Sequence, residues 1–149
     1  MDMESLYDKI YRYCYYRVRD EETARDLTQE TFLRFLGSNY EERGEKIRYL
    51  YTIARNLCIE EARKAKFSEL PEDLSDQGME SEELVDRIRV NMALKRMPEA
   101  DRELLILRYM NGESVTEICR ITGISRFALY RRLKAAEKIF TELMDKESR

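Results

Sequence analysis

The chain has 149 residues and a formal net charge of -3; 43% of its residues are hydrophobic and 38% charged, and with five Gly and two Pro it favours helices over sheets. It contains no His, no Gly-rich phosphate loop and no HExxH-like metal pair, so we expect neither an enzyme nor a bound cofactor or metal. No apolar run approaches the roughly 18 residues of a membrane span, and residues 1–5 lack the blocks of a signal peptide. We therefore expect a cytoplasmic protein without membrane insertion.

The cysteines, Cys14, Cys58 and Cys119, lack CxxC spacing and are expected to be reduced thiols in the core.

Charge is distributed unevenly along the chain. Residues 1–66 carry 13 basic and 13 acidic side chains, residues 67–86 carry eight acidic and no basic ones, and residues 87–149 carry 14 basic and nine acidic ones. The acidic stretch also contains Pro71 and Gly78, and such a composition resists helix formation and extends through self-repulsion. An acidic connector thus separates a neutral half from a basic one.

These segments predict an all-α protein with two small helical domains joined by a flexible acidic linker. The N-terminal domain is placed at 1–66, the linker at 67–80 and the C-terminal domain at 81–149. Fully extended, the linker could span on the order of 45 Å. That reach would let the domains sit on separate stretches of one large partner.

The first half is expected to form three helices. Apolar side chains recur at helical spacing in the first, and they are Leu6, Ile10, Cys14 and Val18. Asp20 can cap a second helix, which Gly37 ends. After a polar loop at 38–44, the third helix is expected over 45–66.

Two faces are predicted for the third helix. One arc is apolar and should be core; it holds Ile47, Leu50, Ala54, Leu57 and Cys58. The opposite side gathers cationic and polar residues, namely Arg48, Thr52, Arg55, Asn56, Arg63 and Lys66. Lys and Arg neutralise phosphates and Asn can pair with a base edge, so this stripe favours contact with nucleic acid. The alternative is an ordinary solvated helix face.

The second half is expected to end in a helix-turn-helix. A helix capped by Ser81 should run to Met97, and Pro98 suits the first turn of the next, which Asn111-Gly112 stops. Ser114 with Glu117 forms a capping box at the start of a short helix that Gly123 ends, and Ser125 can cap a final helix. A short helix, a Gly-centred turn and a longer helix are typical of DNA-binding proteins, although any tight helical hairpin could use such a turn.

The last helix is predicted to present an outward face that solubility does not explain. Its inward residues are Leu129, Leu133, Ala136 and Phe140, and its outward ones are Phe127, Tyr130, Arg131, Lys134 and Lys138. In a recognition helix, Arg can bind guanine and an aromatic ring can touch a thymine methyl. The alternative is that Phe127 and Tyr130 pack against the preceding helices.

Three strings resemble bacterial sigma factors of the extracytoplasmic-function type, within the sigma-70 family. Residues 20–34 (DEETARDLTQETFLR) resemble the helix that docks on the polymerase clamp, and residues 49–57 (YLYTIARNL) resemble the promoter-melting helix. Residues 97–109 (MPEADRELLILRY), followed by Glu117-Ile-Cys and Gly123-Ile-Ser, resemble the domain that reads the minus-thirty-five element. The resemblance implies a non-catalytic protein that binds core RNA polymerase at its clamp and flap regions, recognises promoter DNA and is held by an anti-sigma factor.

The resemblance also implies roles for individual residues. The polymerase-binding set is Asp26, Gln29, Glu30 and Leu33. The minus-ten set is Tyr40, Arg48, Thr52, Arg55, Asn56 and Arg63, in which Tyr40 and Asn56 would hold a flipped base. The minus-thirty-five set is Arg126, Phe127, Tyr130, Arg131, Lys134 and Lys138.

The chain departs from the family pattern in three places. Tyr49 stands where a Trp is common, Ala128-Leu129 replaces the usual Thr-Val, and residues 135–137 (AAE) replace a basic run. The last two put the promoter sequence and the grip on phosphates in doubt.

Two other classes of protein remain open: a DNA-binding regulator that works without polymerase, and a purely protein-binding helical module. The net charge of -3 argues against an autonomous DNA binder, because such binding depends on positive charge.

Overall fold

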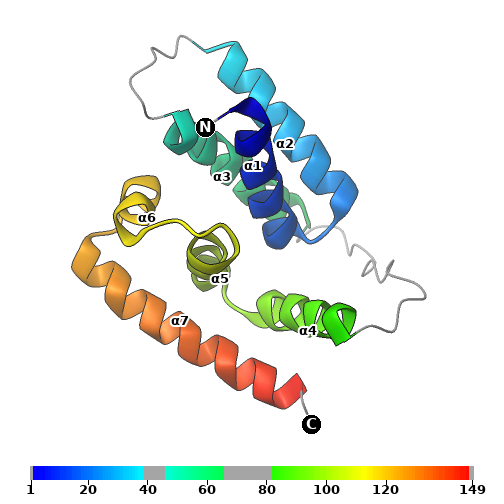
Figure 1. Cartoon of the computed structure of the whole chain (residues 1–149), viewed down its shortest axis with the longest axis vertical. Coiled ribbons are helices and arrows are strands. Elements are labelled where there is room, and N and C mark those ends of the chain that lie inside the picture. The colour runs from blue at the N-terminus through cyan, green and yellow to red at the C-terminus, as the bar shows by residue number, and fades with distance from the viewer. Residues whose placement is uncertain (1, 39–45, 66–81, 148–149) are drawn as a thin grey trace.

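The computed structural model describes residues 2–38, 46–65 and 82–147, and every regular element in these ranges is helical (Figure 1). The elements are α1 (Met3–Val18), α2 (Glu21–Leu36), α3 (Lys46–Ala65), α4 (Glu82–Arg96), α5 (Glu99–Leu105), the π-helix η1 (Ile106–Met110), α6 (Val115–Thr122) and α7 (Arg126–Glu147). The all-α prediction is confirmed. The predicted linker at 67–80, most of the predicted loop at 38–44 and the predicted cap Ser81 lie outside the described residues.

Helix ends lie where local side chains can satisfy backbone groups. The Asp20 carboxylate accepts a hydrogen bond from the Thr23 N–H at 3.0 Å, and the Ser114 hydroxyl accepts one from the Glu117 N–H at 3.1 Å. Both are the predicted N-caps. Gly123 ends α6 in the left-handed conformation, with a φ of 77°, which glycine adopts without steric cost.

The junction between α4 and α5 differs slightly from the prediction. Pro98 is the N-cap of α5 and so precedes the first turn in which it was expected. Carbonyls at the end of α4 and just after it accept hydrogen bonds from one side chain: the Arg102 guanidinium donates to the oxygens of Leu94 at 2.7 Å and of Lys95 and Met97 at 3.1 Å each. A helix end in the protein interior needs such donors. Arg102 thereby joins the start of α5 to the end of α4.

The helix-turn-helix prediction is confirmed in α6 and α7. Leu129 is fully buried, while Cys119 and Ile124 are half-buried near the turn. The Gly123 N–H donates to the Cys119 carbonyl at 2.9 Å and closes the last turn of α6. Along α7, the predicted inward residues Leu133 and Ala136 are buried and Phe140 is half-buried. The opposite face of α7 is therefore turned to solvent.

One apolar cluster runs through both halves of the chain. From α1, α2 and α3 its buried members are Leu6, Ile10, Tyr13, Cys14, Ala24, Phe32, Phe35, Leu50, Tyr51, Ala54 and Cys58. From α5, η1, α6 and α7 they are Leu104, Ile106, Leu107, Ile118, Ile121, Leu129 and Leu133. Figure 1 shows the second half lying against the first, and the contacts between the two join η1 to α1 and α6 to α3. Within this core, the free thiols of Cys14 and Cys58 lie 3.9 Å apart.

Candidate nucleic-acid interface

The first turns of α7 expose two aromatic rings. Phe127 is 80% exposed and Tyr130 is 55% exposed, so the alternative that they pack against the preceding helices is wrong. The Arg131 guanidinium carbon lies 5.9 Å from the centre of the Phe127 ring, within range of a cation–π contact. Such a contact orients a cation without neutralising it. Arg131 therefore remains able to bind an acceptor.

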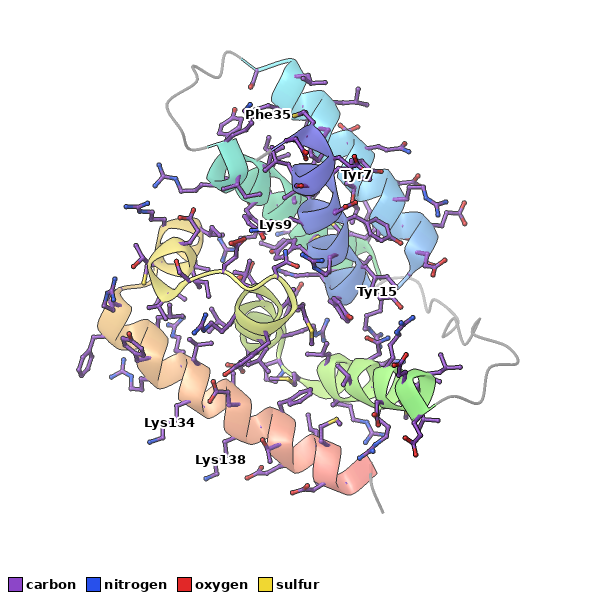
Figure 2. All side chains as sticks on the ribbon, in the orientation of Figure 1. Tyr7, Lys9, Tyr15, Phe35, Lys134 and Lys138 are labelled. Atoms are coloured by element: carbon purple, nitrogen blue, oxygen red, sulfur yellow. The ribbon has the colours of Figure 1, made fainter. Side chains whose placement is uncertain are left out.

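Cationic side chains continue this surface along α7. Arg126, Lys134 and Lys138 are all exposed, and Figure 2 shows Lys134 and Lys138 pointing away from the rest of the molecule. The six side chains predicted to meet the minus-thirty-five element thus share one exposed side of α7. An aromatic group near the helix start and cations further along suit base edges and phosphates respectively.

The predicted DNA-binding face of α3 is only partly available. Thr52, Asn56 and Arg63 are exposed, and Arg48 is half-buried. Arg55 differs: its Nε donates to Glu103 Oε2 at 2.7 Å, and 33% of its side chain remains exposed. Lys66, the remaining predicted member of this face, and Tyr40, the loop residue of the predicted minus-ten set, lie outside the described residues.

The predicted polymerase-binding face of α2 is exposed and mixed in character. Asp26 and Gln29 are exposed, and Leu33 is 65% exposed. Glu30 is half-buried and accepts a hydrogen bond from Arg34 Nε at 2.9 Å. Sequence reasoning missed Leu36, which is 68% exposed and lies one turn beyond Leu33. Its spacing from Leu33 was the signal that could have revealed it.

A buried polar cluster joins the two halves, and sequence reasoning did not predict it. Oxygen Oε2 of Glu103 in α5 accepts three hydrogen bonds, from Tyr13 Oη at 2.7 Å, Arg17 Nη1 at 2.8 Å and Arg55 Nε at 2.7 Å. The side chains of Arg17 and Glu103 are 4% and 5% exposed. Arg17 also donates to Glu99 at 2.8 Å. We call Glu103, Tyr13, Arg17 and Arg55 the Glu103 cluster.

The electrostatics of this cluster follow from burial and proximity. Burial alone would lower the pKa of Arg17, but Tyr13 and Glu103 outweigh it and the pKa is raised, so the guanidinium stays charged. Burial raises the pKa of Tyr13 well above its ordinary value, so its hydroxyl stays protonated and can donate. The cluster therefore holds opposite charges whose donors and acceptors are matched.

A second polar cluster lies at the turn after η1. Glu113 accepts hydrogen bonds from Lys9 Nζ at 3.1 Å and from Tyr51 Oη at 2.6 Å. Asn111 Nδ2 donates to Tyr51 Oη at 2.7 Å, and Asn111 Oδ1 accepts from Arg12 Nε at 2.9 Å. Burial, followed by the bond to Glu113, raises the pKa of Tyr51. Figure 2 shows Lys9 on the side of α1 that faces the second half. We call this set the Glu113 cluster.

Within the ranges that the structure describes, no group of three or more His, Cys, Asp or Glu could hold a metal ion. No helix among those residues is long and apolar enough to span a membrane.

The fold and the exposed faces define a helical protein with a helix-turn-helix and a second cationic helix. The Sigma-70 region 2 family matches residues 3–68, and the Sigma-70, region 4 family matches residues 87–139. The chain belongs to the sigma-70 family, and its relatives place it among the sigma factors of the extracytoplasmic-function (ECF) group.

Two curated relatives carry that assignment. The chain is 30% identical to the ECF RNA polymerase sigma factor BldN of Streptomyces coelicolor, over 95% of this chain and 58% of BldN. It is 28% identical to the ECF RNA polymerase sigma factor SigX of Bacillus subtilis, over 98% of this chain and 87% of SigX. The chain thus spans somewhat more than half of BldN and most of SigX.

A solved structure shares the fold. The sigma factor RpoE of Bartonella quintana, crystallised with the anti-sigma factor NepR, matches with a TM-score of 0.71 at 18% identity. The match covers 94% of this chain and 92% of that one.

Proposed function

We propose that this chain binds core RNA polymerase and directs it to specific promoters, acting in the cytoplasm by binding alone and without catalysis. Residues 1–66 would bind the polymerase clamp and the minus-ten element, and residues 81–149 would bind the flap and the minus-thirty-five element. The observation that carries the proposal is the exposed aromatic and cationic side of α7, which follows a helix-turn-helix bend. Membership of the sigma-70 family supports it.

The individual roles follow from the exposed faces. On α7, Arg131 and Tyr130 would contact base edges with Arg126 and Phe127, while Lys134 and Lys138 would contact phosphates. On α3, Asn56 would hold a base that has left the stack, with Tyr40 as the other expected contact.

The remaining cationic residues of α3 would track the backbone of the minus-ten strand. On α2, the exposed polar and apolar side chains would meet the clamp. The residues proposed for these two roles are Arg48, Thr52, Arg55 and Arg63 on α3, and Asp26, Gln29, Glu30 and Leu33 on α2. An anti-sigma factor, the partner of RpoE in its crystal, is the regulator that we propose for this chain as well.

Transcription with purified core polymerase tests the proposal. The chain alone should bind duplex promoter DNA poorly, because a net charge of -3 gives little counterion release, whereas chain plus core should initiate at a defined set of sites on genomic DNA. Core polymerase alone is the control. Tight, sequence-specific binding by the isolated chain at physiological salt would instead identify a regulator that needs no polymerase.

A further inference from the structure

Two thiols meet in the core of the first half, and the proposed function uses neither of them. Cys14 lies on α1 and Cys58 on α3, and they are 0% and 1% exposed. Both thiols are free, and their sulfur atoms lie 3.9 Å apart. A disulfide bond is about 2 Å long, so an approach of about 2 Å would join the two atoms. The cysteines are 44 positions apart in the sequence, and the packing of α1 against α3 brings them together.

The two thiols are not equivalent. The Cys58 thiol donates a hydrogen bond to the Cys14 sulfur. That bond lowers the pKa of Cys14 and, together with burial, raises the pKa of Cys58. The charge of Arg17, one turn after Cys14 on α1, favours the thiolate of either cysteine. Cys14 is therefore the sulfur that ionises first and attacks an electrophile.

Burial decides which oxidant can reach the pair. Fully buried thiols are shielded from bulky reagents, and most buried cysteines are inert for that reason. Hydrogen peroxide is small and uncharged, so the local opening motions of a folded domain are sufficient to admit it. Cys119, which is half-buried on α6, is accessible to larger reagents and provides an internal comparison.

We propose that Cys14 and Cys58 form a redox-sensitive pair, which hydrogen peroxide converts into a disulfide bond between α1 and α3. Space filling alone requires neither two sulfur atoms in contact nor a buried guanidinium near them. In a reducing compartment the bond would be transient, as redox-sensing disulfides are. The inference thus gives the first half a chemical response that is separate from its binding faces.

The reaction consumes one molecule of hydrogen peroxide. The Cys14 thiolate attacks one peroxide oxygen and the O–O bond breaks; the departing hydroxide takes up the proton that Cys14 had lost, which gives water and a sulfenic acid on Cys14. The Cys58 sulfur then attacks the Cys14 sulfur, the S–O bond breaks, and the hydroxyl group leaves with the Cys58 proton as a second water. Each sulfur loses one electron, and the peroxide oxygens gain both.

The bond would also make promoter opening sensitive to peroxide, a consequence that rests on the proposed function. Cys58 lies two residues after Asn56, which is proposed to hold the flipped base. Drawing the Cys58 sulfur toward α1 displaces this stretch of α3, because a close-packed core transmits such movements. We therefore expect the oxidised chain to open promoters several-fold more slowly.

Peptide mass mapping of the full chain tests the disulfide without polymerase or DNA. The folded wild-type chain is treated with hydrogen peroxide, the peroxide is removed with catalase, and the remaining thiols are alkylated in denaturant. We expect a cross-link between the peptides of Cys14 and Cys58, an alkylated Cys119, and complete reversal by dithiothreitol. The urea-unfolded chain is the control, because its three free thiols should give a mixture of all possible pairings.

Serine variants test the roles of the two sulfur atoms. Cys58→Ser should accumulate a sulfenic acid on Cys14 that dimedone traps, whereas Cys14→Ser should leave Cys58 a thiol. Cys119→Ser is the matched control and should form the same cross-link as the wild type. If Cys14→Ser or Cys58→Ser loses helix by circular dichroism, the wild-type map decides alone. A folded wild-type chain in which both thiols survive while Cys119 is oxidised, or which gives the mixture of the unfolded chain, would overturn the proposal.

Promoter opening by the oxidised chain separates this inference from the proposed function. The chain is oxidised, freed of peroxide and mixed with core polymerase, and permanganate footprints are followed before and after reduction. Slower opening that dithiothreitol restores, and that peroxide-treated Cys14→Ser does not show, would support the consequence for α3. Normal opening by a fully cross-linked chain would overturn that consequence. A chain that forms the disulfide yet never binds polymerase would refute the proposed function and leave the redox pair standing.

Discussion

The cationic sides of α3 and α7 differ in what covers them. Both carry Arg or Lys at helical spacing. The α7 side is exposed along its length, whereas on the α3 side Arg55 forms an ion pair with Glu103. The covering acid lies 48 residues away from Arg55 in the sequence and belongs to the other half. A cationic stripe therefore shows where an anion can bind, and only the tertiary structure shows whether one already does.

The largest effect should come from the proposed contact between α2 and core polymerase, because the cationic sides of α3 and α7 both act only in that complex. Asp26→Lys combined with Gln29→Ala should weaken binding to core polymerase at least about thirtyfold, because loss of a charged partner in an interface costs roughly 2 kcal/mol or more. Both DNA-binding sides would remain intact but without effect on transcription. Binding is measured by fluorescence anisotropy, with Asp86→Lys as the control. Unchanged affinity in the folded double variant would remove α2 from the interface.

Substitutions on α7 should separate base contacts from phosphate contacts. Arg131→Ala or Tyr130→Ala should cost roughly 1 to 3 kcal/mol at one base pair of the minus-thirty-five element and change the preferred sequence. Lys138→Ala should instead weaken all promoters alike and lower the salt slope by about one unit. Selection from randomised minus-thirty-five sequences measures both. Identical preferences for wild type and Arg131→Ala would mean that this side of α7 does not read DNA.

On α3, Asn56→Ala should slow promoter opening more than it weakens initial docking. Asn56 is exposed, and a flipped base needs its hydrogen bonds only after unstacking. A net loss of about 1 kcal/mol corresponds to a several-fold slower opening. Permanganate footprints of the holoenzyme over time give the rate, and Glu60→Ala, at another exposed position of α3, is the control. Normal melting with Asn56→Ala would make Asn56 structural.

The smallest expected effect near neutral pH is that of pH itself on the free energy of unfolding. The pKa values of Tyr13 and Tyr51 are raised by burial in the folded chain, so the unfolded chain releases their protons first as pH rises past 10. The free energy of unfolding should be insensitive to these groups below pH 10. Above it, the free energy should fall by up to about 1.4 kcal/mol per pH unit for each tyrosine. Urea unfolding at pH 8 to 11 tests this, and Tyr51→Phe should show a shallower fall. An equal slope in both chains would contradict the assignment.

Most helices could be predicted because their signals are local. Asp20, Ser114 and Gly123 act on backbone groups within four residues, and the apolar spacing of α3 and α7 identified their buried sides. The exposed aromatic pair on α7 followed from the same spacing. These features need no knowledge of distant residues.

The contact between the halves could not be predicted in this way. Arg17 occurs three residues after buried Cys14, and Glu103 directly precedes the apolar stretch 104–107, so each charge was a hint of a buried partner. Neither residue identifies that partner, since 86 residues separate them. The spacing between Leu33 and Leu36 in α2 could have pointed to an exposed apolar pair. That both side chains are exposed is known only from the folded chain.

The π-helix η1 sets the direction in which Asn111 and Glu113 face α1 and α3. Its wide turn, in which the Asn111 N–H donates to the Ile106 carbonyl at 2.9 Å, accommodates one residue more than an α-helical turn would. If the same residues formed a regular α-helix instead, the segment beyond η1 would be rotated by about 100°. Asn111 and Glu113 would then turn away from Tyr51 and Lys9, while α6 and α7 kept their own geometry. Loss of one residue together with the wide turn would leave the direction of the chain unchanged, so a relative with a one-residue gap at 106–110 should keep the contacts of the Glu113 cluster.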